Sequence, residues 1–258
     1  MIHPGLVSIT FRALTPAQIV ALVRQAGLRG IEWGGDIHVP HGDLARARET
    51  RALTLGAGLT VAAYGSYYRA GHSEAAGLPF ASVLDSAVEL GAPIVRVWAG
   101  GAGSDAASPA QRASVVDDLR RIAALAAGAR VAVALEFHAG TLADTAAATR
   151  RLLDEVAHPN LCTYWQPPLV RDTADCLADL RQLQSRLAHV HVFHWRPATT
   201  DRLPLADGAD RWREFLALAA AAPGDRYAML EYVPQDSPAH FLRDAATLRS
   251  WLAADPAA

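Results

Sequence analysis

The residues best suited to chemistry are glutamates that end short apolar segments. The chain contains only eight glutamates, and three of them, Glu32, Glu136 and Glu231, end segments that are otherwise apolar. A buried ionised carboxylate is costly unless it is paired with a cation or binds a metal. Two such carboxylates could bracket a substrate and serve as acid and base. The alternative is that Glu136 pairs with Arg96 and only stabilises the protein.

A second group of candidate residues lies in segment 188–194, which contains three histidines. Side chains alternate between two faces of an extended segment, so His189 and His191 share a face and His194 lies on the other. A single histidine in an apolar strand is usually a hydrogen-bonded core residue, and we expect this of His189. Three histidines in one short segment, in a chain whose glutamates end other apolar segments, favour a metal-ligand role for His191.

The elements that must position these residues alternate between two kinds. Eight apolar or β-branched segments are each followed by a segment of helical period, which predicts a parallel sheet of β–α units. Eight units in 258 residues predict a (β/α)₈ barrel in one domain, residues 1–258, with its core at about 5–253. The strands are expected at 6–10, 30–33, 60–64, 94–98, 131–137, 161–166, 187–193 and 227–232.

Helix starts and the absence of a nucleotide motif support the same fold. Thr15-Pro16-Ala17-Gln18 and Ser108-Pro109-Ala110-Gln111 each combine a capping hydroxyl, a proline and a glutamine three positions later. The sequence has no G-x-G-x-x-G after its first strand, which counts against a dinucleotide-binding fold. In a barrel, the carboxyl ends of the strands carry the catalytic groups.

Composition excludes several classes of function. All 24 basic residues are arginine, so a lysine Schiff base or a P-loop lysine is impossible. The net charge of −2 argues against a nucleic-acid partner, and no apolar run approaches the roughly 20 residues that cross a bilayer. Two cysteines, Cys162 and Cys176, are too few for a disulfide framework. We expect a cytoplasmic protein that acts on a small molecule.

The order of these residues resembles the xylose isomerase-like superfamily, which includes sugar isomerases, ketose 3-epimerases, inosose dehydratases and endonuclease IV. The similar segments lie at the ends of three predicted strands and in one loop: Gly30-Ile31-Glu32-Trp33, Leu135-Glu136-Phe137-His138, His189-Val190-His191-Val192 and Arg202-Leu203-Pro204-Leu205-Ala206-Asp207-Gly208. The resemblance implies that Glu136, His191 and Glu231 are metal ligands and that the two glutamates are the catalytic acid and base.

The predicted sixth strand departs from the family pattern. Gln166 takes the position where the family usually has an Asp ligand, and the histidine expected three residues later is missing. A neutral carboxamide oxygen still suits a divalent cation, but it binds more weakly than a carboxylate. The resemblance therefore implies either a weaker Mn²⁺, Mg²⁺ or Co²⁺ site at Glu136, Gln166, His191 and Glu231, or a site without metal.

The implied reaction is proton transfer on a hydroxy-ketone sugar through an enediolate, which makes the protein a sugar isomerase or epimerase. The alternative is a lyase or dehydratase acting on an oxidised sugar, with or without metal. A DNA-repair endonuclease would need more metal ligands and a basic face, and a non-catalytic scaffold would gain nothing from inward glutamates. The resemblance also suggests a homo-oligomer.

Six further residues are candidates for binding the substrate. Aromatic rings can pack on the apolar face of a sugar, imidazoles can hydrogen-bond hydroxyls or move protons, and guanidinium groups can bind a carboxylate or phosphate. Each could equally be a loop-packing or surface residue. The candidates are His38, Tyr64, Arg69, Trp98, His138 and Arg196.

Overall fold

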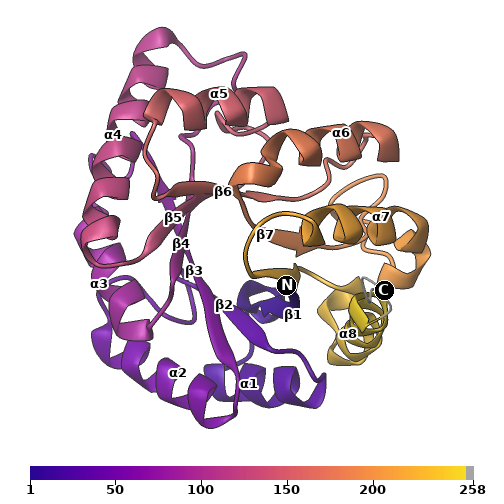
Figure 1. Cartoon of the computed structure of the whole chain (residues 1–258). Coiled ribbons are helices and arrows are strands. Elements are labelled where there is room, and N and C mark those ends of the chain that lie inside the picture. Colours follow the sequence, from indigo (N-terminus) through magenta and orange to yellow (C-terminus); the bar gives the residue numbers. More distant parts are fainter. Residues whose placement is uncertain (254–258) are drawn as a thin grey trace.

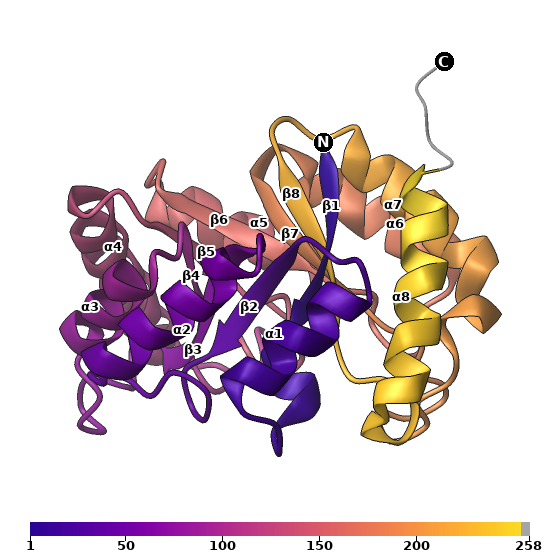
Figure 2. The ribbon, with the colours of Figure 1, turned by 90° about the horizontal axis from the view of Figure 1, so that it is seen from below.

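The computed structural model describes residues 1–253 and confirms the predicted barrel. Eight parallel strands pair in chain order, and β8 closes the barrel against β1. Figure 1 shows the strands at the centre and the helices around them, and Figure 2 shows the same arrangement from below. The strands are β1 Ile2–Val7, β2 Gly30–Gly34, β3 Thr60–Arg69, β4 Ile94–Trp98, β5 Ala132–Leu135, β6 Leu161–Trp165, β7 Leu187–Val192 and β8 Arg226–Leu230.

The helices follow the strands one by one, as the alternating pattern predicts. They are α1 Pro16–Gln25, α2 Leu44–Gly56, α3 Phe80–Leu90, α4 Pro109–Gly128, α5 Ala146–Val156, α6 Thr173–Leu183, α7 Ala209–Ala220 and α8 Pro238–Ala253. Both predicted capping boxes are present, at Thr15 with Gln18 and at Ser108 with Gln111. Among residues 1–253, no helix has the length and apolar composition needed to cross a membrane.

Apolar residues fill two regions. The large core lies between the strands and the helices and includes Trp33, Trp165 and Trp212. A smaller cluster contains Val7, Ala63, Ala134, Tyr164 and Met229. These five residues come from β1, β3, β5, β6 and β8, which are spread around the closed barrel, so they meet inside it, where side chains form packed layers. The barrel interior is therefore solid below its mouth.

Several strand limits differ from those predicted, and the differences bear on the site. β1 ends at Val7 and the chain continues as a 3₁₀ turn at Ser8–Phe11, whereas the sequence pattern placed a strand at 6–10. β3 continues five residues beyond Tyr64, to Arg69, with an irregular register against β4. β5, β6 and β8 each end one or two residues early. Their next residues, Glu136, Gln166 and Glu231, therefore stand at the barrel mouth.

Candidate functional site

Glu136, His191 and Glu231 meet at the mouth of the barrel. One ligand atom from each can be chosen so that all three lie within 4.8 Å of one another, and all three residues are buried. His191 Nδ1 lies 3.4 Å from Glu231 Oε2 and 3.2 Å from Gln166 Oε1. The structure thus brings together the four residues that the sequence predicted as metal ligands.

Two further charged residues complete this cluster, and neither Arg96 nor Glu32 was among the predicted catalytic, metal-binding or substrate-binding residues. Arg96 Nε donates a hydrogen bond of 2.7 Å to Glu32 Oε1, and Arg96 Nη1 donates another to Glu136 Oε2. Arg96 and Glu32 are 1% and 0% exposed, so solvent does not screen the pair. The Arg96–Glu136 pair expected of a purely stabilising glutamate is therefore present inside the same cluster as the possible ligands.

A glycine between the two strands makes room for the buried pair. A Cβ atom at Gly65, on β3, would lie 2.6 Å from Arg96 Nη2 and 2.8 Å from Glu32 Oε1. Contacts this short are repulsive, so any side chain at this position would push the ion pair apart. The only residue type that lets Glu32 of β2 reach Arg96 of β4 across β3 is glycine.

The charges of the cluster match a divalent cation. Three buried carboxylates and one guanidinium leave a net charge of −2 when His191 is neutral. Burial opposes charge on Glu32, but Arg96 and His191 outweigh it and hold the pKa of Glu32 far below its usual value. The pKa of Glu231 is also lowered, because the nearby His191 outweighs the effect of burial. Carboxylate, carboxamide and imidazole donors around a site of this charge suit Mn²⁺, Mg²⁺ or Co²⁺.

Glu32 is placed to orient His191. Glu32 Oε2 lies 3.8 Å from His191 Nε2, and neither atom has a hydrogen-bond partner among residues 1–253. A carboxylate on the far side of a ligating imidazole fixes its tautomer and orientation. Here it would leave Nδ1 facing Gln166 and Glu231, where a metal would be held.

The Glu32→Gln substitution is therefore expected to weaken Mn²⁺ binding by about 10- to 100-fold while leaving the fold intact. The amide keeps the size of the side chain but loses the charge that orients His191 and balances Arg96. Calorimetric titration with Mn²⁺ measures the effect, with Glu89→Gln on the surface as the matched control. Equal affinity in Glu32→Gln and the control would contradict a positioning role for Glu32.

Metal binding is expected to displace a proton from His191. Burial lowers the pKa of His191, but the carboxylates of Glu231 and Glu32 outweigh burial and raise it to about 9. In the metal-free protein this raised pKa stabilises the fold below the ordinary pKa of 6.5, and the contribution is lost as pH rises through 9. A nitrogen that binds metal carries no proton, so Mn²⁺ binding at pH 7.5 should release about one proton per chain.

Titration calorimetry in two buffers of different ionisation enthalpy counts the released protons. The number should fall towards zero above the pKa of His191, where the imidazole is already neutral. A buffer-independent binding enthalpy at pH 7.5 would show that His191 binds no proton in the metal-free protein.

A cavity of about 360 Å³ opens next to the cluster. Its volume lies at the small end of the range for ligand pockets, which suits a compact polar substrate. Trp98 and His138 both line it, as predicted, and their rings stack with centroids 4.5 Å apart. Glu136, Gln166 and Glu231 contribute to the same lining, so the predicted acid and base face the space that a substrate would occupy.

Four predicted substrate-binding residues lie outside the lining of this cavity. His38 is buried against Trp33, with Nδ1 2.9 Å from Ser8 Oγ. The Tyr64 hydroxyl donates to the Val39 carbonyl oxygen, since β3 continues past Tyr64 and leaves it within the strand.

The other two are arginines. Arg196 is exposed and donates to the carbonyl oxygen of Arg171, although other residues of its loop line the cavity. Arg69, at the end of β3, lines a separate cavity.

The cavity also contains Tyr67, whose ring could pack on the apolar face of a sugar, and six residues that were not predicted to bind the substrate: Ile9, Trp195, Thr199, Thr200, Arg202 and Tyr232. Tyr67 and Tyr232 adopt left-handed backbone conformations, with φ of 56° and 48°. Such strained positions concentrate at functional sites. Tyr67 lies in β3, and Arg202 begins the loop that resembles the family pattern. The others come from segments that follow strands, which only the folded barrel brings to the cavity.

Comparison with known proteins agrees with this architecture. The 3-dehydroshikimate dehydratase of Bacillus anthracis is 35% identical over 103 residues, a match that spans 38% of this chain and 35% of that protein. The chain thus matches only about a third of that relative's length.

Two solved structures are similar over nearly the whole chain. The probable 3-DHS dehydratase AsbF of B. anthracis has a TM-score of 0.80 at 22% identity, covering 96% of this chain and 98% of that one. The 3-keto-D-glucoside 4-epimerase YcjR of E. coli has a TM-score of 0.75 at 20% identity, covering 97% and 100%. Identities this low show a shared fold. The model of the xylose isomerase-like TIM barrel family matches residues 20–252, and the chain therefore belongs to that family.

Proposed function

We propose that this protein is a metal-dependent sugar isomerase or epimerase that removes and returns a proton beside the carbonyl of a small hydroxylated ketone. The observation that carries the proposal is the placement of Glu136 and Glu231. Both are buried, both line the 360 Å³ cavity, and both offer an oxygen within 4.8 Å of His191. Membership of a family that contains isomerases and epimerases supports it.

The two glutamates have different surroundings, which suggests different roles. Glu136 accepts a hydrogen bond from Arg96, and the guanidinium partly neutralises the negative charge of this carboxylate. Glu231 has no arginine partner among residues 1–253 and faces His191, and its lowered pKa keeps it ionised at neutral pH. We therefore assign proton removal to Glu231, which then carries the proton and can return it; proton return by Glu136 would require that carboxylate to take up a proton first.

The remaining residues of the cavity bind the substrate and supply charge. A divalent ion held by Glu136, Gln166, His191 and Glu231 would place positive charge beside the carbonyl oxygen, where negative charge develops. The indole of Trp98 offers a flat apolar surface for the carbon face of the substrate. His138, stacked on Trp98, can hydrogen-bond a hydroxyl or take up a proton.

A dehydratase is the second candidate, favoured by the partial match to a 3-dehydroshikimate dehydratase. Its reaction starts with the same removal of a proton beside a carbonyl. It differs in the next step, because a hydroxyl on the neighbouring carbon leaves as water and no proton returns. His138 is the residue in the cavity placed to protonate such a leaving hydroxyl.

One experiment separates the two. The Mn²⁺-loaded protein is incubated in D₂O with a panel of ketohexoses, 3-keto-glucosides and 3-dehydroshikimate, and the products are followed by proton NMR and ultraviolet absorbance. Deuterium at the carbon beside the carbonyl, without loss of water, is the result expected of an isomerase or epimerase. An unsaturated product without recovered ketone would identify a dehydratase. No exchange and no unsaturation on any of the panel would count against both.

A further inference from the structure

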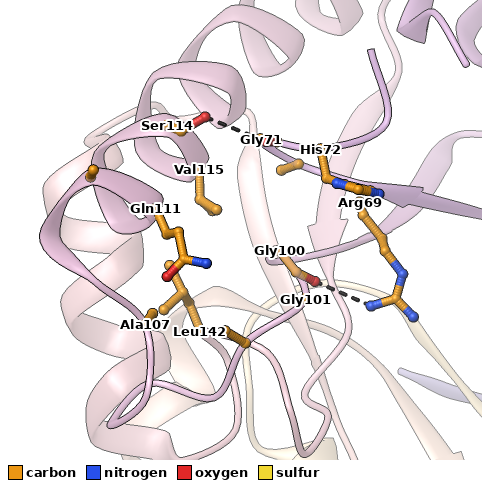
Figure 3. Close-up of a pocket in the computed structure, with 13 residues that line it drawn as sticks. Arg69, Gly71, His72, Gly100, Gly101, Ala107, Gln111, Ser114, Val115 and Leu142 are labelled. Carbon is orange, nitrogen blue, oxygen red and sulfur yellow. Dashed lines mark hydrogen bonds between the residues drawn. The ribbon is translucent and has the colours of Figure 1, made fainter. Parts of the chain in front are cut away.

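A second, larger cavity of about 770 Å³ lies beside the site and has no role in the reaction proposed above. Figure 3 shows it between the first turns of α4 and the segments that follow β3 and β4. Arg69 and His72 line one side, Gly100 and Gly101 form part of the floor, and Gln111 projects from α4 on the other side. The space is large enough for a charged group together with part of a carbon skeleton.

Arg69 connects this cavity to the reaction site. Its guanidinium lies over the indole of Trp98, with Cζ 4.1 Å from the ring centroid. Trp98 lines the smaller cavity and stacks on His138, which lies in the segment that follows β5, the next strand beyond β4. The Arg69–Trp98 pair therefore lies between the two cavities, with Arg69 lining the larger one and Trp98 the smaller one.

Among the described residues 1–253, the charge of Arg69 has no anionic partner. Its side chain makes one hydrogen bond within residues 1–253, from Nη1 to the Gly100 carbonyl oxygen at 3.3 Å. The missing side chain at Gly101 leaves the guanidinium accessible, since a Cβ there would meet only Arg69 Nη1, at 3.8 Å, within a 4 Å radius. A guanidinium has five N–H donors in a planar fork, so most of its donors remain available to a ligand.

Gln111 presents a second donor to the same space. Its Oε1 accepts a hydrogen bond from the Ser108 backbone N–H in the capping box, which turns the Nε2 amide towards the cavity (Figure 3). Within residues 1–253, no aspartate or glutamate lines the cavity. Its polar side chains thus offer positive charge and N–H donors with no carboxylate to compete for them.

We propose that this cavity binds the carboxylate or phosphate group of the substrate through Arg69 and Gln111. The substrate is then an anionic hydroxy-ketone, held with its reacting carbon beside Glu231 and its charged group beyond Trp98. The assignment to the substrate rests on the proposed function, whereas the anion site itself does not. Arginine suits the task because it binds carboxylates and phosphates with two parallel hydrogen bonds.

Two substitutions test the anion site on the full chain, purified without added divalent metal, with inorganic phosphate as the probe. Arg69→Met removes the cation while keeping an apolar stem over Trp98. Gln111→Glu keeps the capping box, since a glutamate serves equally well at that position, but puts a negative charge into the cavity. Gln18→Glu is the matched control, because it makes the same change in the capping box of α1, outside this cavity.

Calorimetry should show phosphate binding of equal affinity in the parent and Gln18→Glu proteins, and at least tenfold weaker binding in the other two. Unchanged binding in Arg69→Met and Gln111→Glu would overturn the site, as would an equal loss in Gln18→Glu. Thermal melts check the fold of each variant, and Gln111→Glu decides the matter if Arg69→Met does not fold.

Kinetics then decide whether the bound group belongs to the substrate. With a substrate identified in D₂O, phosphate should inhibit competitively, and Arg69→Met should raise KM at least tenfold with a much smaller change in kcat. Non-competitive inhibition, or a preferred substrate without an anionic group, would show that the cavity takes a separate anion and would overturn the assignment to the substrate. Phosphate binding without turnover of any substrate would instead retain the anion site and reject the proposed function.

Discussion

Replacing Glu231 with glutamine is expected to lower kcat by about 10²- to 10⁴-fold. The amide has nearly the same shape as the carboxylate, but it cannot accept the proton that the reaction removes. It also changes the net charge of the buried cluster from −2 to −1, which weakens binding of a divalent cation. The rate of deuterium incorporation into the ketone, measured at saturating Mn²⁺, separates the loss of the base from the loss of the metal.

Glu155→Gln, which alters a surface glutamate that pairs with Arg112 and Arg151, is the control and should leave the exchange rate unchanged. The informative contrary result has three parts. If Glu231→Gln keeps the deuterium exchange rate and the metal content of the parent protein and melts at a higher temperature, Glu231 is only a buried charge, as in a non-catalytic scaffold.

Replacing Arg96 with methionine is expected to lower the free energy of unfolding by about 3–5 kcal/mol. The guanidinium is 1% exposed and pairs with both Glu32 and Glu136. Methionine fills a similar volume, but it leaves two carboxylates buried without their cation, and each must then be protonated or drawn towards solvent. Urea denaturation at pH 7 measures the difference between the two proteins.

The same comparison has a definite pH dependence. In the parent protein the depressed pKa of Glu32 stabilises the fold above its unfolded value of 4.5, and this stability is lost as pH falls. Arg96→Met lacks that contribution, so the difference in stability between the two proteins should begin to shrink below about pH 4.5 and vanish only as pH falls through the depressed pKa of Glu32. Arg46→Met, which removes an exposed pair with Glu49, should cost less than about 1 kcal/mol. A similarly small loss for Arg96→Met at pH 7 would refute the view that Arg96 neutralises the cluster.

Local sequence patterns were sufficient to predict the barrel. Eight β–α units follow from alternating apolar and helical segments, and the capping boxes at Thr15 and Ser108 mark helix starts that the structure confirms. The barrel then implies that residues after the strands converge, because the carboxyl ends of parallel strands share one face. That reasoning was enough to place Glu136, Gln166, His191 and Glu231 together.

The limits of the strands were harder to predict, and they decided which binding residues reach the cavity. The segment Tyr64–Arg69 is rich in aromatic residues and glycine, which suits either a strand or a loop, and in the barrel it continues β3. Tyr64 therefore lies inside a strand and Arg69 at its end, facing the second cavity. A shift of a few residues in a strand end moves a side chain from one cavity to another.

The sequence by itself predicted the fold, through its alternating apolar and helical segments, and its resemblance to the family implied the possible metal ligands at the strand ends. Only the tertiary structure decided which charges neutralise one another. Glu32 and Arg96 lie 64 positions apart on strands separated by β3, and their contact depends on the register of three strands and on the space left by Gly65. Electrostatic pairing inside the barrel depends on distances of a few ångströms in a medium of low dielectric constant, and those distances exist only after the barrel closes.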